Sequence, residues 1–89
     1  MNAVVSVIGK DRVGILAFAT NKCQACNANI IEVSQTILNE YFAMIMIVNI
    51  DKLNLEFVEF VDEFEKEGSK VGLEIHVMHE DIFNSMHKI

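Results

Sequence analysis

The sequence of 89 residues contains no proline, no tryptophan, four glycines and two cysteines. Without proline and without a low-complexity stretch, nothing in the chain resembles a linker between domains, so we expect residues 1–89 to form one domain. Two cysteines in a chain that shows no export signal are expected to be reduced thiols rather than a disulfide.

Basic residues are also scarce. Seven Lys and Arg stand against thirteen Asp and Glu, which gives a formal net charge of −6. The densest basic pair is Lys10 with Arg12, too little to hold a phosphate backbone, so we expect no nucleic-acid partner. Residues 1–3 carry no signal-peptide pattern, and the longest apolar run, residues 42–48, is too short to span a bilayer. We therefore expect a cytoplasmic protein with no membrane partner.

What is abundant is apolar side chains, at 52% of the residues, enough for one compact core. Their periodicity, together with turn residues, predicts an ordered series of strands and helices. Strands are predicted at residues 4–8, 30–38, 42–50 and 71–78, and helices at residues 14–26, between Asn54 and Gly68, and at residues 81–89. Asn54 is predicted to cap the second helix and Gly68 to end it in the left-handed conformation.

This order, βαββαβ followed by a terminal helix, predicts an α+β fold. It is the ferredoxin-like sandwich, in which two helices cover one face of a four-stranded antiparallel sheet. Right-handed crossovers place the first and third strands in the centre and leave the second and fourth at the edges.

The third predicted strand is apolar on both faces, because Met44 and Met46 alternate with Ile45 and Ile47. Two helices hide only one of these faces, so either the terminal helix or a second copy of the chain must cover the other. The second strand is an apolar edge around Ile31, which favours edge-to-edge pairing. We predict a homodimer.

The junction between the first strand and the first helix is the best candidate for a binding site. Helix-start N–H groups lack intrahelical partners there, Asp11 supplies a carboxylate, and Gly9 and Gly14 allow a ligand to approach the main chain. The pattern indicates a site for a small molecule.

These features together resemble the ACT domain, a regulatory module that binds amino acids and related small molecules, usually at a dimer interface. The resemblance covers roughly residues 3–78 and rests on the order of elements and two motifs, Gly9-Lys10-Asp11-Arg12-Val13-Gly14-Ile15-Leu16 and Asn27-Ala28-Asn29-Ile30. The tail resembles that of small stand-alone ACT proteins, distantly similar to glycine-cleavage repressor proteins. The resemblance implies a non-catalytic module without a cofactor.

The same resemblance implies the ligand-binding residues: Asp11 with Arg12, the backbone of Gly14 and Ile15, and Asn29. An acidic side chain suits an ammonium group, and an amide suits either end of a zwitterion. The sequence departs from the family at Val13, where proline is usual, and at Gly9, where some members have a histidine. A simpler interpretation stays open, in which Asp11 only caps the helix and Asn29 only begins a strand.

Two further groups of residues could carry chemistry. Cys23 and Cys26 lie at the far end of the first helix, where the helix dipole raises a thiol pKa, and they share its apolar stripe, so we predict core residues. His76 and His79 point to opposite faces of a strand, so with His87 they could bind a metal only through a fold or dimer contact. Metal binding remains the weaker alternative.

No enzyme motif is present in the chain: Gly-x-Ser-x-Gly, phosphate-loop and dinucleotide fingerprints are all absent. Arg12 after the first strand is shared with acylphosphatases, but their following Asn and Gly pattern is missing. The second helix has an acidic face, which consists of Glu56, Glu59, Asp62, Glu63, Glu65 and Glu67. We interpret it as a solvated surface. The alternative function is a ligand-free interaction module that acts through this surface or the terminal helix.

Overall fold

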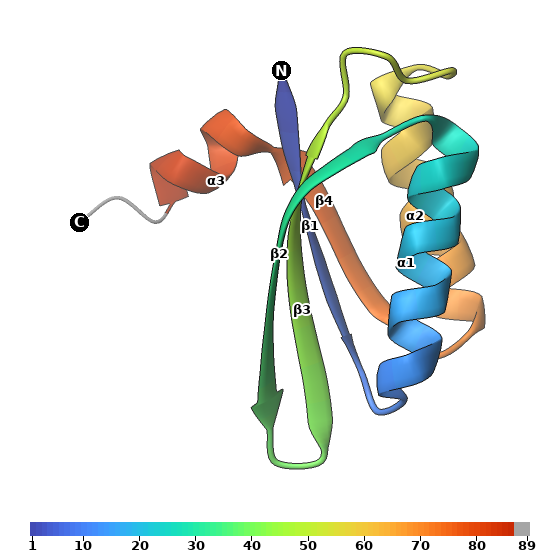
Figure 1. Cartoon of the computed structure of the whole chain (residues 1–89), viewed down its shortest axis with the longest axis vertical. Coiled ribbons are helices and arrows are strands. Elements are labelled where there is room, and N and C mark those ends of the chain that lie inside the picture. The colour runs from blue at the N-terminus through green and yellow to red at the C-terminus, as the bar shows by residue number, and fades with distance from the viewer. Residues whose placement is uncertain (87–89) are drawn as a thin grey trace.

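The computed structural model describes residues 1–86 and arranges them in two layers, a sheet and a pair of helices (Figure 1). The elements in order are β1 (Asn2–Gly9), α1 (Arg12–Cys26), β2 (Asn29–Leu38), β3 (Tyr41–Asn49), α2 (Phe57–Lys70), β4 (Glu74–His79) and α3 (Glu80–Met86). Helices α1 and α2 lie side by side against one face of the sheet, and α3 projects from the other side.

The sheet has the strand order β2-β3-β1-β4, and every neighbouring pair is antiparallel. This confirms the predicted fold, with β1 and β3 in the centre. The strands β2 and β3 form a two-residue hairpin in which Asn39 takes a positive φ of 57°. The pairing of β2 with β3 shifts between Ile30 and Glu32, which leaves Ile31 as a bulge.

The core lies between the sheet and the two helices. Its innermost side chains, all less than 2% exposed, are Val5, Val7, Met44, Met46 and Val48 from the strands and Ile15, Cys23, Phe60 and Phe64 from the helices. Phe60 and Phe64 meet edge to face with ring centroids 5.5 Å apart. Both cysteines are buried free thiols, as predicted for core residues.

The ends of α2 differ from the prediction. Glu56 rather than Asn54 is the N-cap, and its N–H donates to the Glu59 carboxylate at 3.2 Å. Asn54 instead donates its side-chain amide to the carbonyl of Ala25 at 2.8 Å, which ties the β3–α2 loop to the end of α1. Here a tertiary hydrogen bond overrides the local capping preference.

Gly68 does not end α2, which continues to Lys70. The left-handed residue is Gly72, with φ 81°, so β4 begins at Glu74 rather than at the predicted residue 71. Gly68 is buried, and a Cβ built on it would overlap Ile75 Cδ1. Its role is therefore to let α2 approach β4 closely.

Two helix boundaries also differ from those predicted. Helix α1 begins at Arg12, two residues before the predicted start, because Asp11 provides its cap. Helix α3 covers Glu80–Met86, and the rest of the predicted helix, residues 87–89, lies outside the described residues. None of the helices within residues 1–86 is long and apolar enough to cross a membrane.

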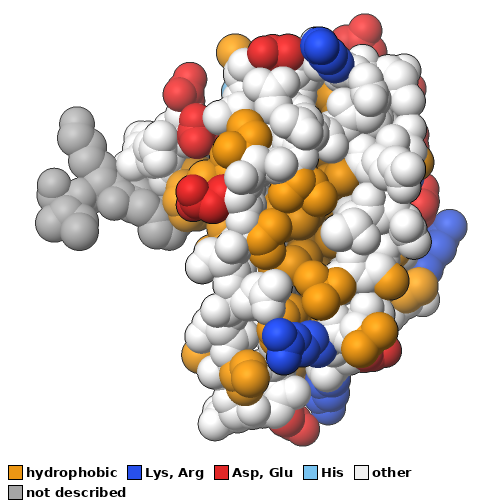
Figure 2. Space-filling model, viewed as in Figure 1, with side chains coloured by type: hydrophobic (Ala, Val, Ile, Leu, Met, Phe, Trp, Pro, Cys, Tyr) orange, Lys and Arg blue, Asp and Glu red, His pale blue; other side chains and the backbone are white. Residues whose placement is uncertain are grey.

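Strand β2 is the most exposed element of the sheet, with nine exposed residues among its ten. Its apolar side chains include Ile31 and Ile37, which are 52% and 69% exposed. Hydrophobic side chains gather in a band between the sheet and α1 (Figure 2). On the opposite face of the sheet Ile45 is 41% exposed. The described residues therefore leave apolar surface uncovered near β2 and on the open face.

Candidate functional site

The turn between β1 and α1 is organised by the Asp11 carboxylate. Asp11 is the N-cap of α1, and its Oδ1 accepts the N–H of Gly14 at 3.0 Å, while its carbonyl accepts the N–H of Ile15 at 2.9 Å. A Cβ on Gly14 would lie only 2.8 Å from Asp11 Oδ2. A side chain at position 14 would therefore crowd the capping carboxylate, and the structure confirms that Asp11 caps α1.

The cap changes which backbone groups a ligand could use. The N–H groups of Gly14 and Ile15 are already bonded to Asp11. The backbone N–H groups at the helix start that have no partner within the helix are therefore those of Arg12 and Val13. The Ile15 side chain is fully buried in the core and cannot reach a ligand.

Arg12 and Asp11 face different hollows. The Arg12 guanidinium lies over the Phe42 ring, 5.4 Å from its centroid, and donates to Gln35 Oε1 at 3.4 Å. It borders a hollow of about 290 Å³ against β2, whereas Asp11 borders one of about 330 Å³ between Lys10, Tyr41, Glu74 and other residues of the β1 and β4 ends.

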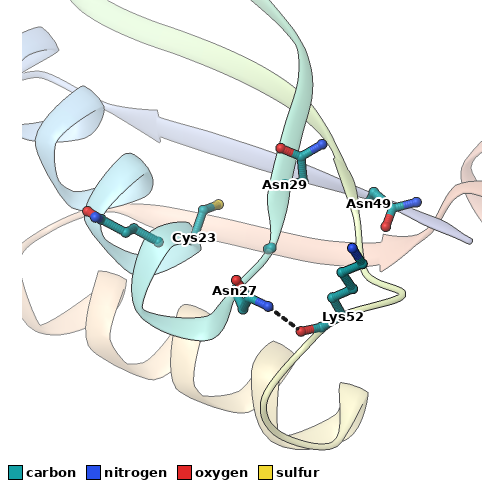
Figure 3. A pocket seen from close by; sticks show the side chains of 7 residues that line it. Cys23, Asn27, Asn29, Asn49 and Lys52 are labelled. Carbon is teal, nitrogen blue, oxygen red and sulfur yellow. Dashed lines mark hydrogen bonds between the residues drawn. The ribbon is translucent and has the colours of Figure 1, made fainter.

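Asn29 lies at the other end of α1, in a cavity of about 450 Å³ (Figure 3). The cavity is lined by Cys23, Gln24, Asn27, Ala28, Asn29, Asn49 and Lys52. In Figure 3 the Lys52 amine points toward the side of the cavity where Asn29 and Asn49 lie. The lining therefore combines amides with one cationic group.

Hydrogen bonds hold the walls of this cavity in place. Asn27 ends α1 in the left-handed conformation, with φ 62°, and donates its amide to the Lys52 carbonyl at 2.8 Å. Asn49 donates to Asn2 Oδ1 at 3.2 Å and accepts the N–H of Asp51 at 3.1 Å. Within residues 1–86, neither the Asn29 amide nor the Lys52 ammonium has a bonding partner. Both groups are therefore available to a ligand.

Cys23 forms the inner wall of the cavity. Burial, together with a smaller contribution from the neighbouring Cys26, raises the pKa of its thiol to about 12. Burial likewise raises the pKa of Cys26. Both thiols are therefore neutral near pH 7 and act as small apolar groups rather than nucleophiles.

The sequence identified Asn29 but missed Asn49 and Lys52. Asn49 is the direct pairing partner of Asn29 across β2 and β3, and Lys52 follows three residues later. Only the strand register brings these three residues together. The available signal was the change from an apolar strand to a segment with four polar residues, Asn49, Asp51, Lys52 and Asn54.

The predicted site residues do not converge within one chain. Helix α1 has 15 residues, so its ends are separated by about 22 Å. Asp11, Arg12, Gly14 and Ile15 lie at its start, whereas Asn29 lies beyond its end. One small molecule can contact both groups only if they come from different copies of the chain.

The histidines are also separated. His76 pairs with Ser6 and His79 with Ala3, which places them on opposite faces, as predicted. His76 Nε2 lies 3.4 Å from Glu74 Oε1, and the His79 ring packs on Phe57 at 4.7 Å between centroids. Among residues 1–86 no group of three or more His, Cys, Asp and Glu side chains could hold a metal. His87 lies outside the described residues.

The acidic face of α2 is partly structural. Lys22 of α1 is nearly buried and donates to Glu63 and Glu67 of α2, each at 2.9 Å. Burial alone would lower the pKa of Lys22, but these two carboxylates raise it above its usual value. Glu63 and Glu67 are still 45% and 47% exposed, so they belong to a solvated surface, as predicted, and also hold α1 against α2.

Comparisons with known proteins find similar sequences and similar folds. A UPF0237 protein of Listeria innocua is 46% identical over 89 residues, with both chains covered completely. A UPF0237 protein of Methanocaldococcus jannaschii is 48% identical over 86 residues, which is 97% of this chain and 96% of the relative.

Among solved structures, an ACT domain protein from Streptococcus pneumoniae has a TM-score of 0.81 and 36% identity, with 98% of each chain covered. A glycine cleavage system transcriptional repressor, described as putative, has a TM-score of 0.71 at 15% identity over 89% of this chain and 47% of its own, which shows a common fold. The model of the ACT domain family matches residues 2–78. The chain therefore belongs to the ACT domain family.

Proposed function

We propose that the protein is a regulatory module that binds a small molecule, an amino acid or a similar zwitterion, at the interface of a homodimer. ACT domains are typically regulatory and ligand-binding. The observation that carries the proposal is the division of the candidate site: the capped turn at Asp11 and the cavity at Asn29 lie at opposite ends of α1.

Pairing of two copies along their β2 edges would bring the two parts of the site together. Strand β2 runs back along α1, since Arg12 at the helix start meets Gln35 near the strand end. If two copies pair antiparallel along β2, the start of one strand lies opposite the end of the other. Asn29 of one copy then approaches the Asp11 turn of the second, and two equivalent seams form.

The two halves have complementary chemistry for a zwitterion. The Asp11 carboxylate suits an ammonium group, while the Lys52 ammonium and the Asn29 amide suit a carboxylate. The apolar band between β2 and α1 (Figure 2) would be covered by the second copy and would accommodate an apolar side chain of the ligand.

Such a ligand would regulate by binding one assembly state better than another. A molecule that contacts both copies binds the dimer and not the separated chains, so it shifts the equilibrium toward the dimer.

Thermal shift against the twenty amino acids tests this function. A ligand at about 100 times its Kd adds about 2.7 kcal/mol to the stability of the state that binds it, a rise in Tm of roughly 10–20 °C for a domain of this size. The rise should disappear in Asp11→Ala, Asn29→Ala and Lys52→Ala. It should persist in Lys70→Ala, an exposed lysine at the end of α2.

The quantity compared between variants is the rise in Tm that the ligand causes. The Tm without ligand is not compared, because Asp11→Ala also removes a helix cap. If no amino acid raises Tm, or if the rise is unchanged in all three variants, the proposed function is contradicted.

A ligand-free interaction module is the second candidate, favoured by one observation. Helix α3 leaves Ile82 and Met86 54% and 66% exposed, which suits contact with another protein. Under this alternative no amino acid raises Tm, and the double substitution Ile82→Ser with Met86→Ser abolishes partner binding without changing the stability of the isolated protein.

A further inference from the structure

At the outer edge of β4, one backbone N–H group is hydrogen-bonded to a side chain of the same chain. The Val77 N–H is donated to Glu65 Oε2 at 3.1 Å. Glu65 belongs to α2, which packs closely along β4 because the buried Gly68 presents no side chain to Ile75. The N–H groups at the outer side of an edge strand are normally free to pair with a strand of another chain. Here a carboxylate accepts a hydrogen bond from one of them.

The two edges of the sheet differ in this respect. Strand β2 has ten residues and one charged side chain, Glu32. Strand β4 has six residues, carries Glu74 and two histidines, and has the Glu65 carboxylate at the middle of its edge. A second strand approaching β4 would have to displace Glu65 and to place its own carbonyl oxygen beside an anion.

This asymmetry decides what self-association through strand edges can build. If both edges were available, each copy could pair twice, through β2 and through β4, and assembly would continue without limit. With one edge available, two copies pair through β2 around a twofold axis and no edge is left to extend the sheet.

We propose that Glu65 closes the β4 edge, so that the β2 edge is the docking surface for a second copy and assembly stops at two chains. The inference rests on the homodimer of the proposed function. It assigns to Glu65 a role in limiting assembly, distinct from any role in ligand binding.

Sedimentation velocity over a series of protein concentrations tests this inference. The wild-type chain of 10.1 kDa should reach twice its mass and stop. Glu65→Ala should form species larger than a dimer whose size grows with concentration. Glu65→Gln keeps an acceptor oxygen for the Val77 N–H and should behave as the wild type does.

A second substitution identifies the other edge. Val33→Lys places a charge on β2, at a side chain that is 42% exposed. Added to Glu65→Ala, it should return the large species to small ones. Circular dichroism establishes that each variant is folded, and amide exchange of Val77 should be slow in the wild type and in Glu65→Gln and fast in Glu65→Ala.

The outcomes separate this inference from the proposed function. A folded Glu65→Ala that never exceeds the wild-type mass contradicts the inference, whether or not the wild type is dimeric. If Glu65→Ala does not fold, fast exchange of Val77 in the wild type would contradict it instead. A monomeric wild type contradicts the homodimer and, with it, docking at the β2 edge, whereas the role of Glu65 is contradicted only when Glu65→Ala stays at the wild-type mass.

Discussion

Replacing Gly68 by alanine tests the close contact between α2 and β4, on which the position of Glu65 depends. In an open helix, alanine in place of glycine stabilises by about 1 kcal/mol. At Gly68 the new Cβ would overlap Ile75 Cδ1 and lie 2.9 Å from Ile75 Cγ1. Overpacking of this kind destabilises by about 1–3 kcal/mol. We therefore expect a net loss of about 1 kcal/mol despite the better helix propensity.

The contact predicts a specific rescue. Ile75→Val removes the overlapping methyl group and by itself destabilises by about 0.5–1.5 kcal/mol. The double variant should be no less stable than Ile75→Val alone, because alanine at position 68 then contributes its helix propensity with less strain. Urea unfolding followed by circular dichroism measures these differences as shifts in midpoint at a constant slope.

Gly72→Ala is the matched control. Gly72 has φ 81° and no heavy atom within 4 Å of a built Cβ, so its loss of about 1 kcal/mol comes from backbone strain. That loss should be the same with Ile or Val at position 75. If Gly68→Ala stabilises the protein, or if its effect is also independent of residue 75 within about 0.5 kcal/mol, the proposed close contact is refuted.

Three further predictions concern the α1 cap, a buried thiol and a nearly buried ammonium group. Asp11→Ala should destabilise by about 1 kcal/mol through loss of the α1 cap, and Asp11→Asn by less, as measured by urea unfolding; equal losses would contradict the capping role. Above pH 9 stability should fall, because the unfolded Cys23 thiol loses its proton near 9.0 while the folded thiol keeps it to about 12. Cys23→Ala should make this alkaline decline shallower, and an unchanged pH profile would contradict the assignment. Lys22→Ala removes a nearly buried ammonium group with two ion pairs of 2.9 Å and should lower the stability by about 1–2 kcal/mol. Lys70→Ala, at an exposed lysine, is the control, and an equal loss of stability in the two variants would contradict the role of Lys22.

The periodicity of the sequence was sufficient for the fold because α1, α2, β3 and β4 each bury one clear face. The stripe of Phe60 and Phe64 indicated which side of α2 faces the core, and the structure buries both. Strand β3 is apolar on both faces in sequence, and the structure buries Met44 and Met46 while Ile45 stays exposed. Short connections and right-handed crossovers then left one strand order.

Helix ends were less predictable, because tertiary contacts decide them. Asn54 has the preferred chemistry for a cap, but its amide bonds to the Ala25 carbonyl. Gly68 and Gly72 are equally plausible helix stops in sequence, and only the packing of α2 on Ile75 shows which glycine serves close approach and which serves a positive φ.

The candidate site was predictable in part for a similar reason. Asp11 lies in a local motif, so its position could be read directly. Lys52 and Asn49 border the Asn29 cavity only through the register of β2 and β3, which residue spacing does not specify. The separation of Asp11 from Asn29 follows from the length of α1 and becomes meaningful only once the helix and both turns are placed.

Crosslinking between two different cysteine variants tests most directly whether the Asp11 turn and the Asn29 cavity meet across a dimer interface. One chain carries Lys10→Cys beside Asp11, and the other carries Asn29→Cys; the native thiols of Cys23 and Cys26 are buried and do not compete. A short bismaleimide should join one chain of each kind into a covalent pair and should give far less product with either chain alone. Absence of the mixed product in a folded sample would contradict the proposal that the Asp11 turn and the Asn29 cavity meet across a dimer interface.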